Sequence, residues 1–494
     1  MFATLLVASM VMPMKAQTSF EEYKQQKDAK FQGYKDQKQK DFDAYRREKN
    51  VRYAEFLRQK WGQYDATPID TAKQEEPIVP PVIYEGPEPT PTPQPIPEPK
   101  PIKIDKDILV IPTPQPQPKP IVPIVPQDDQ KINKESISFY GTLVTIGFPN
   151  PDNFRLTRID DQGIATAWEY LMEEKYDVVI ATALSARKSL SLCDWAYIEM
   201  LQLVCEKHYG KSANEASMMM AYVLIQSGYK LRFGHSNNRL YVLINSDYVI
   251  YDRISYTIEG ERFYPLNCKE RSLYICDASF ESEQSLSLQI SKEQKFDYQS
   301  TAQRTLSSSK GIRANICVNK NVIDFYNSYP TACINGDFGT RWAAYANTPL
   351  EKKVKDDFYP QLKKTIEGLS ELEQVNAILN FVQTAFVYEY DDKVWGDDRA
   401  FFATETLFYP YCDCEDRSIL FSRIVRDILG LNVILLYYPG HLATAVKFNS
   451  DVKGDYLMVK GEKYIVCDPT YIGAPVGETM PNMDNKKAKV IVLN

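Results

Sequence analysis

The 494-residue chain has few histidines, fewer basic than acidic residues and only a short N-terminal apolar run, and each shortage limits the functions that it can have. It contains only three histidines, so any site that needs an imidazole must use His208, His235 or His441. Its 58 basic residues are outnumbered by 65 acidic ones, and a net charge of −7 argues against nucleic acid binding, which favours a basic domain. The apolar run at residues 2–14 spans roughly 13 positions, which is too short to cross a bilayer.

That N-terminal run resembles a secretion signal. The apolar stretch is followed by Lys15, Ala16 and Gln17, in the manner of a cleavage site that ends in alanine. Phe2 follows Met1 directly, so the usual basic start is missing and the true start is expected upstream. No cysteine follows the run, so we expect no lipoprotein anchor. We predict a signal peptide at 1–16 and an exported protein of the bacterial envelope, periplasmic or extracellular.

An eleven-residue repeat follows the predicted signal. Aromatic residues recur at every eleventh position, a second aromatic follows three positions later, and a lysine recurs at a third fixed phase; the first set is Phe20, Phe31, Phe42, Tyr53 and Tyr64. Eleven residues make three helical turns, so these side chains share one helix face. We predict a charged helix over 17–65. Either it is a solvated helix with a weak coiled-coil seam for self-association, or its aromatic and lysine stripe binds a partner or an anionic envelope polymer.

Proline dominates the next segment, which we predict to be a linker over 66–130. Alternating proline favours polyproline II at about 3.1 Å per residue and prevents a packed core, so the pattern predicts a stiff spacer. An apolar interruption at 102–111 is interpreted either as a short strand or docking motif, or simply as part of the tether.

Three short motifs near the C-terminus carry a thiol, an imidazole and a carboxylate in that order. They contain Cys414, His441 and Asp468. A thiolate attacks an acyl carbon, an imidazole moves its proton, and a carboxylate orients the imidazole. Helical periodicity after Cys414 ends at Gly430, which places the thiol at a helix N-terminus and predicts a lowered pKa. Strands at 433–438, 441–448 and 464–467 would bring His441 and Asp468 side by side if they pair antiparallel.

The pattern Cys414-Glu-Asp-x-Ser, a helix that ends in Leu-Gly, then Gly-His441 and Asp468-Pro-Thr-Tyr, resembles the transglutaminase-like superfamily of papain-fold cysteine enzymes. The resemblance covers roughly 370–481. It implies an α+β fold in which the cysteine-bearing helix packs on an antiparallel sheet, with a further helix at 371–387. It makes Cys414 the nucleophile, His441 the general base and acid, and Asp468 the orienting group. Leu442 departs from the family, because many members have Ala-Trp after the histidine.

Together with the predicted signal, the resemblance implies an exported cysteine acyl-transfer enzyme, a peptidase or amidase, and we place its catalytic domain at 350–494. Its expected substrate is a peptide or protein amide such as a cell-wall peptide, and hydrolysis is favoured over transamidation. No metal and no cofactor are expected. Three alternatives stay open: Cys412 as the nucleophile, a non-catalytic envelope scaffold that retains the fold, and a zinc site built from Cys412, Cys414, His441 and Cys467. Nine cysteines permit disulfides in an exported protein, but their pairing is not readable.

Two regions lie between the linker and the predicted catalytic domain. Residues 131–266 alternate helices and strands and form an α/β domain, and 267–349 are predicted to be a β-rich module. The first region is either a degenerate second copy of the catalytic fold or a chance similarity. Counted from Gly228 as from Gly430, Ser212 stands in the place of Cys414 and Arg239 in that of His441, while Asp252 echoes Asp468. Such a copy would lack the nucleophile.

Overall fold

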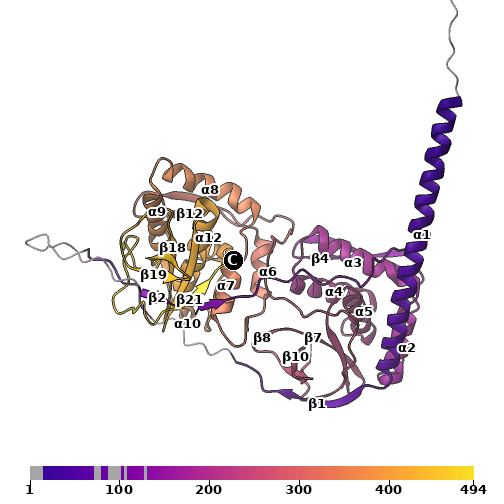
Figure 1. Ribbon diagram of the computed structural model, residues 1–494. Coiled ribbons are helices and arrows are strands. Elements are labelled where there is room, and N and C mark those ends of the chain that lie inside the picture. The colour runs from indigo at the N-terminus through magenta and orange to yellow at the C-terminus, as the bar shows by residue number, and fades with distance from the viewer. Residues whose placement is uncertain (1–14, 72–78, 87–101, 105–107, 127–130, 267) are drawn as a thin grey trace, which may run out of the picture.

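The computed structural model describes residues 15–71, 79–86, 102–104, 108–126, 131–266 and 268–494 (Figure 1). Within these residues the fold is mixed α+β, as the resemblance led us to expect at this coarse level. Residues 1–14 of the predicted signal peptide lie outside the described residues. None of the helices in the described ranges combines the length and the hydropathy that crossing a bilayer requires.

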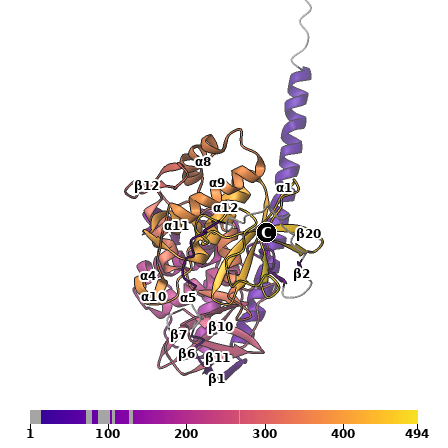
Figure 2. The ribbon, with the colours of Figure 1, turned by 90° about the vertical axis from the view of Figure 1, so that its left-hand side faces the viewer.

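The N-terminal helix α1 (Lys15–Leu57) is 43 residues long and projects away from the rest of the molecule (Figures 1 and 2). Only its C-terminal part docks on the N-terminal half, where Tyr53 and Leu57 are buried and Arg46 forms a 2.6 Å ion pair with Asp177. The prediction that the helix continues to residue 65 is wrong. Residues Trp61–Thr67 form strand β1 instead, because pairing with two strands of a barrel outweighs the local helical pattern.

The N-terminal half is built around a closed barrel with the strand order β1-β11-β6-β7-β10-β9, and α5 packs on β7. Its elements are the strands β4 (Ile132–Phe139) and β5 (Thr142–Pro149), the helices α2 (Asp161–Leu171), α3 (Asp177–Ser189), α4 (Asp194–Tyr209) and α5 (Asn214–Gln226), the 3-10 turn η1 (Glu174–Tyr176), and the strands β6 (Leu231–Ser236), β7 (Arg239–Asn245), β8 (Tyr248–Ile250), β9 (Ser255–Ile258), β10 (Glu261–Pro265) and β11 (Ser272–Cys276).

The C-terminal half is built around a seven-stranded sheet with the order β2-β19-β20-β18-β17-β21-β3, and α12 packs on β17 and β18. Its elements are the helices α6 (Lys320–Ser328), α7 (Gly339–Asn347), α8 (Lys352–Ile366), α9 (Glu371–Thr384), α10 (Asp391–Val394), α11 (Ala403–Phe408) and α12 (Cys414–Leu429), and the strands β2 (Ile102–Ile104), β3 (Ile108–Val110), β12 (Arg304–Ser307), β13 (Arg313–Ile316), β14 (Ala332–Ile334), β15 (Val387–Tyr388), β16 (Tyr411–Cys412), β17 (Asn432–Tyr438), β18 (His441–Lys447), β19 (Tyr456–Val459), β20 (Glu462–Cys467) and β21 (Lys489–Val492).

Both faces of this sheet are buried. Along β17, Val433 and Leu435 join the main core, which extends into the N-terminal half, whereas Ile434 and Leu436 join a separate apolar cluster. Successive side chains of a strand point to opposite faces, so the continuous apolar run of β17 fits a strand that is covered on both sides. Packed side chains therefore cover the sheet on both sides.

The two halves share one strand order. Five barrel strands are arranged β11-β6-β7-β10-β9, and five strands of the C-terminal sheet are arranged β21-β17-β18-β20-β19, with every neighbouring pair antiparallel. In chain order β6, β7, β9, β10 and β11 correspond to β17, β18, β19, β20 and β21. A helix precedes the first strand of each set and packs on the second, α5 on β7 and α12 on β18.

This correspondence changes the expected residue matches. Arg239 opens β7 as His441 opens β18, as the sequence count predicts. The first residue of α5 is Asn214, however, so Asn214 and not Ser212 occupies the place of Cys414. The match of Asp252 with Asp468 is also wrong, because Asp252 follows β8, which pairs with β14 outside the barrel.

The described parts of the proline-rich segment do not form a free spacer. Its interruption at 102–111 contains β2 and β3, which add parallel strands to the two edges of the C-terminal sheet. Further along, Gln117 donates to the carbonyl of Leu192, and Arg187 donates to the carbonyl of Pro118. Proline lacks one donor but keeps its carbonyl, so such a segment can still pack against a folded surface.

The predicted β-rich module at 267–349 is not a separate unit. Strand β11 closes the barrel of the N-terminal half, whereas the hairpin β12–β13 packs against α8 of the C-terminal half. The remainder contains α6 and α7, which pack on α11 and α12 respectively. The strands of this region belong to three different sheets: β11 to the barrel, β12 and β13 to their own hairpin, and β14 to a pair with β8.

Candidate active site

The N-terminus of α12 holds Cys414 in a fixed position. Asp413 is the N-cap, and its carboxylate accepts from the backbone N–H groups of Glu415 and Asp416. Asp416 reaches back to the N–H of Asp413 at 3.3 Å, which completes a capping box. At the other end, Gly430 adopts a left-handed conformation with φ of 68°, as its predicted role at the helix end requires.

A tight hairpin positions His441. Strands β17 and β18 pair antiparallel from Tyr438 and His441 onward, and Pro439 and Gly440 form the two-residue turn between them. Gly440 has a φ of 76°, a conformation that glycine adopts without steric cost. The hydroxyl of Ser418, on α12, donates to the carbonyl of Leu442 at 2.9 Å and so ties the helix to the strand that carries the histidine.

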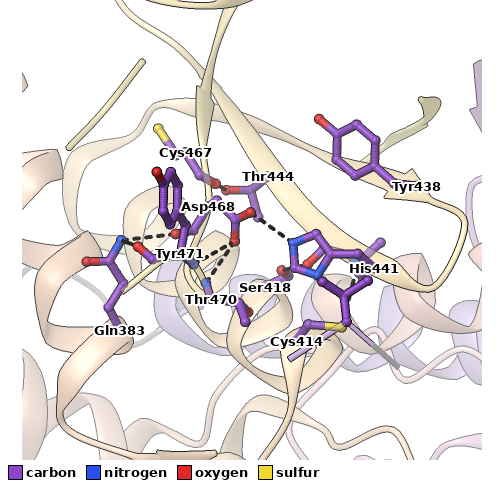
Figure 3. Close-up of polar contacts among 12 residues, drawn as sticks. Gln383, Cys414, Ser418, Tyr438, His441, Thr444, Cys467, Asp468, Thr470 and Tyr471 are labelled. Carbon is purple, nitrogen blue, oxygen red and sulfur yellow. Dashed lines mark hydrogen bonds and ion pairs between the residues drawn. The ribbon is translucent and has the colours of Figure 1, made fainter. Parts of the chain in front are cut away.

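The carboxylate of Asp468 lies beside the imidazole of His441 (Figure 3). Its Oδ2 is 2.8 Å from Nε2 of His441, and its Oδ1 accepts from the backbone N–H groups of Thr470 and Tyr471 at 2.8 and 3.2 Å. Strand β20 pairs antiparallel with β18, which brings the end of one strand next to the start of the other. The predicted adjacency of His441 and Asp468 is therefore present, and the turn after β20 fixes the carboxylate's direction.

The remaining ring nitrogen of His441 is available to a thiol. Nδ1 is buried and has no hydrogen-bond partner among the described residues, while Figure 3 places the ring next to Cys414. The Cys414 sulfur accepts from the backbone N–H of Leu442 at 3.4 Å. Because Nε2 is held by Asp468, Nδ1 is the nitrogen that can exchange a proton with the sulfur. The arrangement can support nucleophilic attack by sulfur assisted by an imidazole.

The thiol itself is not activated in the way that the helix terminus predicts. Burial raises the pKa of Cys414 well above its usual value, and the carboxylates of Asp413 and Glu415 raise the pKa further. Neither Cys414 nor His441 has solvent-exposed surface. The prediction of a lowered pKa is therefore contradicted in this closed arrangement, because the helix N-terminus is already capped by an acidic side chain and water is excluded.

Five buried or largely buried carboxyl groups surround the start of α12. Burial and mutual repulsion raise the pKa of Asp391 to about 8 and that of Asp413 to about 7, and they raise those of Glu415 and Asp416 well above the usual range. Asp398 completes the set. The nearby guanidinium groups are those of Arg341, which lies 2.7 Å from Asp398 and 3.7 Å from Glu415, and of Arg417.

Two sets of three side chains in this cluster could each supply ligands to a metal, because their potential ligand atoms lie within 4.8 Å of one another. The sets are Asp413, Cys414 and Glu415, and Asp391, Asp398 and Glu415. In the second group, Arg341 already supplies a positive charge. The alternative zinc set is not assembled among the described residues. The sulfur of Cys412 faces the carbonyl of Val387 and that of Cys467 faces the carbonyl of Ile465. All nine cysteines lie within the described ranges, and none forms a disulfide.

Sequence reasoning missed Gln383, which braces the loop that carries Asp468. The amide nitrogen of Gln383 donates to the carbonyls of Asp468, Tyr471 and Ala474, and its oxygen accepts from the N–H of Gly473. A signal was present, because Gln383 continues the apolar face of α9 at helical spacing from Val375 and Leu379. A buried glutamine on such a face needs several partners, and this loop provides them.

Comparison with known proteins gives no relative for this chain. No family model, no curated protein and no solved structure matches it. The resemblance to the transglutaminase-like superfamily is therefore not supported by these comparisons and stays a prediction that rests on the residues themselves.

Proposed function

We propose that this protein is a cysteine-dependent amide hydrolase with Cys414 as nucleophile, His441 as proton carrier and Asp468 as orienting carboxylate. The observation that carries the proposal is the 2.8 Å contact between Asp468 and Nε2 of His441, with the buried Nδ1 left without a partner beside Cys414. We further propose that the C-terminal half belongs to the transglutaminase-like superfamily and that the protein works in the bacterial envelope.

In the proposed reaction, Nδ1 of His441 takes the proton of Cys414 and the sulfur attacks the carbonyl carbon of a peptide or protein amide. The imidazolium then gives its proton to the departing amine, which leaves a thioester on Cys414. Water attacks the thioester, with His441 again accepting a proton, and the carboxylic acid product and free thiol result. The ion pair with Asp468 stabilises the imidazolium in both steps.

Amine release from a library of peptide amides tests this proposal. We expect turnover by the full chain, and loss of turnover in Cys414→Ala and in His441→Ala. The matched control is Cys412→Ala, which removes the neighbouring thiol and should leave turnover in place. Activity that survives Cys414→Ala, or that is lost only in Cys412→Ala, would assign the reaction to another group.

A non-catalytic scaffold is the second candidate, because one observation favours it. The Cys414 thiol is fully buried, and its pKa is raised rather than lowered. A scaffold predicts that no peptide releases amine, neither with the full chain nor with a variant in which Cys414 has become accessible to iodoacetamide. Turnover by such a variant, with the labelling of Cys414 measured by intact mass, argues against this candidate.

A further inference from the structure

A short piece of the proline-rich segment, residues 79–86, lies along the turn before His441 and the loop after Asp468. The backbone N–H of Val79 donates to the carbonyl of Gly440, next to His441. The carbonyl of Val79 accepts from the hydroxyl of Tyr388 at 3.4 Å, and the pKa of Tyr388 is raised by burial and then by the nearby Cys414. The described part of the segment thus begins beside Gly440 and Tyr388, which neighbour the histidine and the nucleophile.

The same piece then follows the loop beyond Asp468. The N–H of Tyr84 donates to the carbonyl of Ile472 at 2.9 Å, and the N–H of Ile472 donates to the carbonyl of Val82 at 2.8 Å. These two bonds form a parallel bridge centred on Ile83 and Ile472. The contact is therefore the addition of a short extended strand, made by backbone groups that any peptide chain possesses.

Side chains alternate in this contact as they do in a strand. Val82 and Tyr84 pack on the cluster of Tyr471, Ala474 and Met480, and the rings of Tyr84 and Tyr471 meet edge to face at 5.6 Å. Ile83, between them, is 70% exposed. Pro80 and Pro81 precede this stretch and restrict the backbone to extended conformations, which lowers the entropy lost on docking.

We propose that residues 79–84 occupy the groove in which the substrate binds, and that the substrate is an extended peptide with apolar side chains at alternate positions. That the bound peptide is a substrate rests on the proposed function, whereas the position of residues 79–84 rests on their contacts alone. A peptide that enters must displace the segment, because the segment takes up the backbone partners at Gly440 and Ile472. The segment is thus an internal competitor for these partners.

Peptide binding in trans tests the groove without any need for turnover. The probe is a fluorescein-labelled peptide with the sequence of residues 79–86, and binding is measured by fluorescence anisotropy to the full chain carrying Cys414→Ala. We expect weak binding to this protein and binding tighter by about tenfold or more when Val82→Asp and Tyr84→Ala are added, since the internal competitor is then weakened. The matched control is Ile83→Ala, whose side chain faces solvent and which should change nothing.

A second measurement follows access to the thiol in the chain with Cys414 intact. Iodoacetamide should label Cys414 about tenfold faster in the Val82→Asp/Tyr84→Ala variant than in the parent or in Ile83→Ala. If the variant neither binds the peptide nor labels faster, the segment does not occupy a binding groove and the inference is overturned. If both readouts respond but no amide is cleaved, the groove stands and the proposed function fails.

Discussion

Removing one negative charge from the carboxyl cluster around Cys414 is expected to stabilise the fold at alkaline pH. Burial and neighbouring carboxylates raise the pKa of Asp391 to about 8. An acid whose pKa is higher in the folded than in the unfolded chain binds more protons when folded, so stability is greatest at low pH. That stability is lost as pH rises from about 4, the unfolded value, through about 8. The chain should therefore melt at a higher temperature at pH 5.5 than at pH 8.5.

The expected change in stability follows from the size of the pKa shift of Asp391. About four pKa units would correspond to roughly 5 kcal/mol for an isolated group. The carboxyls of this cluster titrate together, so one substitution recovers a part, on the order of 2 kcal/mol. In a domain of about 200 residues this moves the melting temperature by about 4–8 °C. Asp391→Asn keeps an oxygen to accept from the N–H of Arg399, a bond of 2.7 Å in the parent, and removes only the charge.

Thermal melts at the two pH values, followed by circular dichroism, measure this difference. Asp391→Asn should raise the melting temperature at pH 8.5 and have little effect at pH 5.5. The matched control is Asp392→Asn, whose side chain is exposed and should show neither change. The reasoning is refuted if Asp391→Asn melts lower than the parent at pH 8.5, or if the parent itself is more stable there than at pH 5.5.

Three further predictions concern the triad, its support and the N-terminal helix. Asp468→Asn keeps the shape of the side chain but removes the charge that stabilises an imidazolium, so amide turnover should fall by about 100-fold or more while the melting temperature changes little. Gln383→Leu removes four hydrogen bonds from the loop of Asp468 and should lower the free energy of unfolding by about 2–4 kcal/mol in a denaturant titration; Gln374→Leu, on the same helix, is the control. Arg46→Met leaves the Asp177 carboxylate buried without its partner, so we expect the free energy of unfolding to fall by about 3–5 kcal/mol and trypsin to cleave faster within α1. Neither change should follow Arg47→Met, which replaces an exposed residue.

The parts of the site that sequence predicts are those set by neighbouring residues. The start of α12 at Cys414, its end at Gly430 and the turn before His441 follow from caps and turn residues that act within a few positions. What sequence does not predict depends on distant partners. Residues 61–67 leave the helical repeat because β9 and β11 are there to pair with them, and β2 and β3 find sheet edges more than 350 positions away. The raised pKa of Cys414 belongs to this second class, because burial is a property of the assembled fold.

The shared strand order of the two halves separates structural from catalytic features of the site. In the N-terminal half, the N–H of Leu240, one position after Arg239, donates to the side chain of Asn214, the first residue of α5. In the C-terminal half, the N–H of Leu442 donates to Cys414 in the same way. In both halves, therefore, the first residue of the helix accepts a hydrogen bond from the second strand of the hairpin, and this contact does not require a thiol.

The pair of His441 and Asp468 has no such counterpart, because Arg239 stands at the position of the histidine and carries only donors. Where Arg239 carries a fixed positive charge, His441 carries one ring nitrogen that can accept a proton, so of the two halves only the C-terminal one can exchange a proton with its helix terminus. Replacing His441 with Arg should therefore abolish amide turnover, with the carboxylate of Asp468 as the partner of the new guanidinium. A variant that unfolds would show that the two strand starts are not equivalent, and one that retains turnover would remove the imidazole from the mechanism.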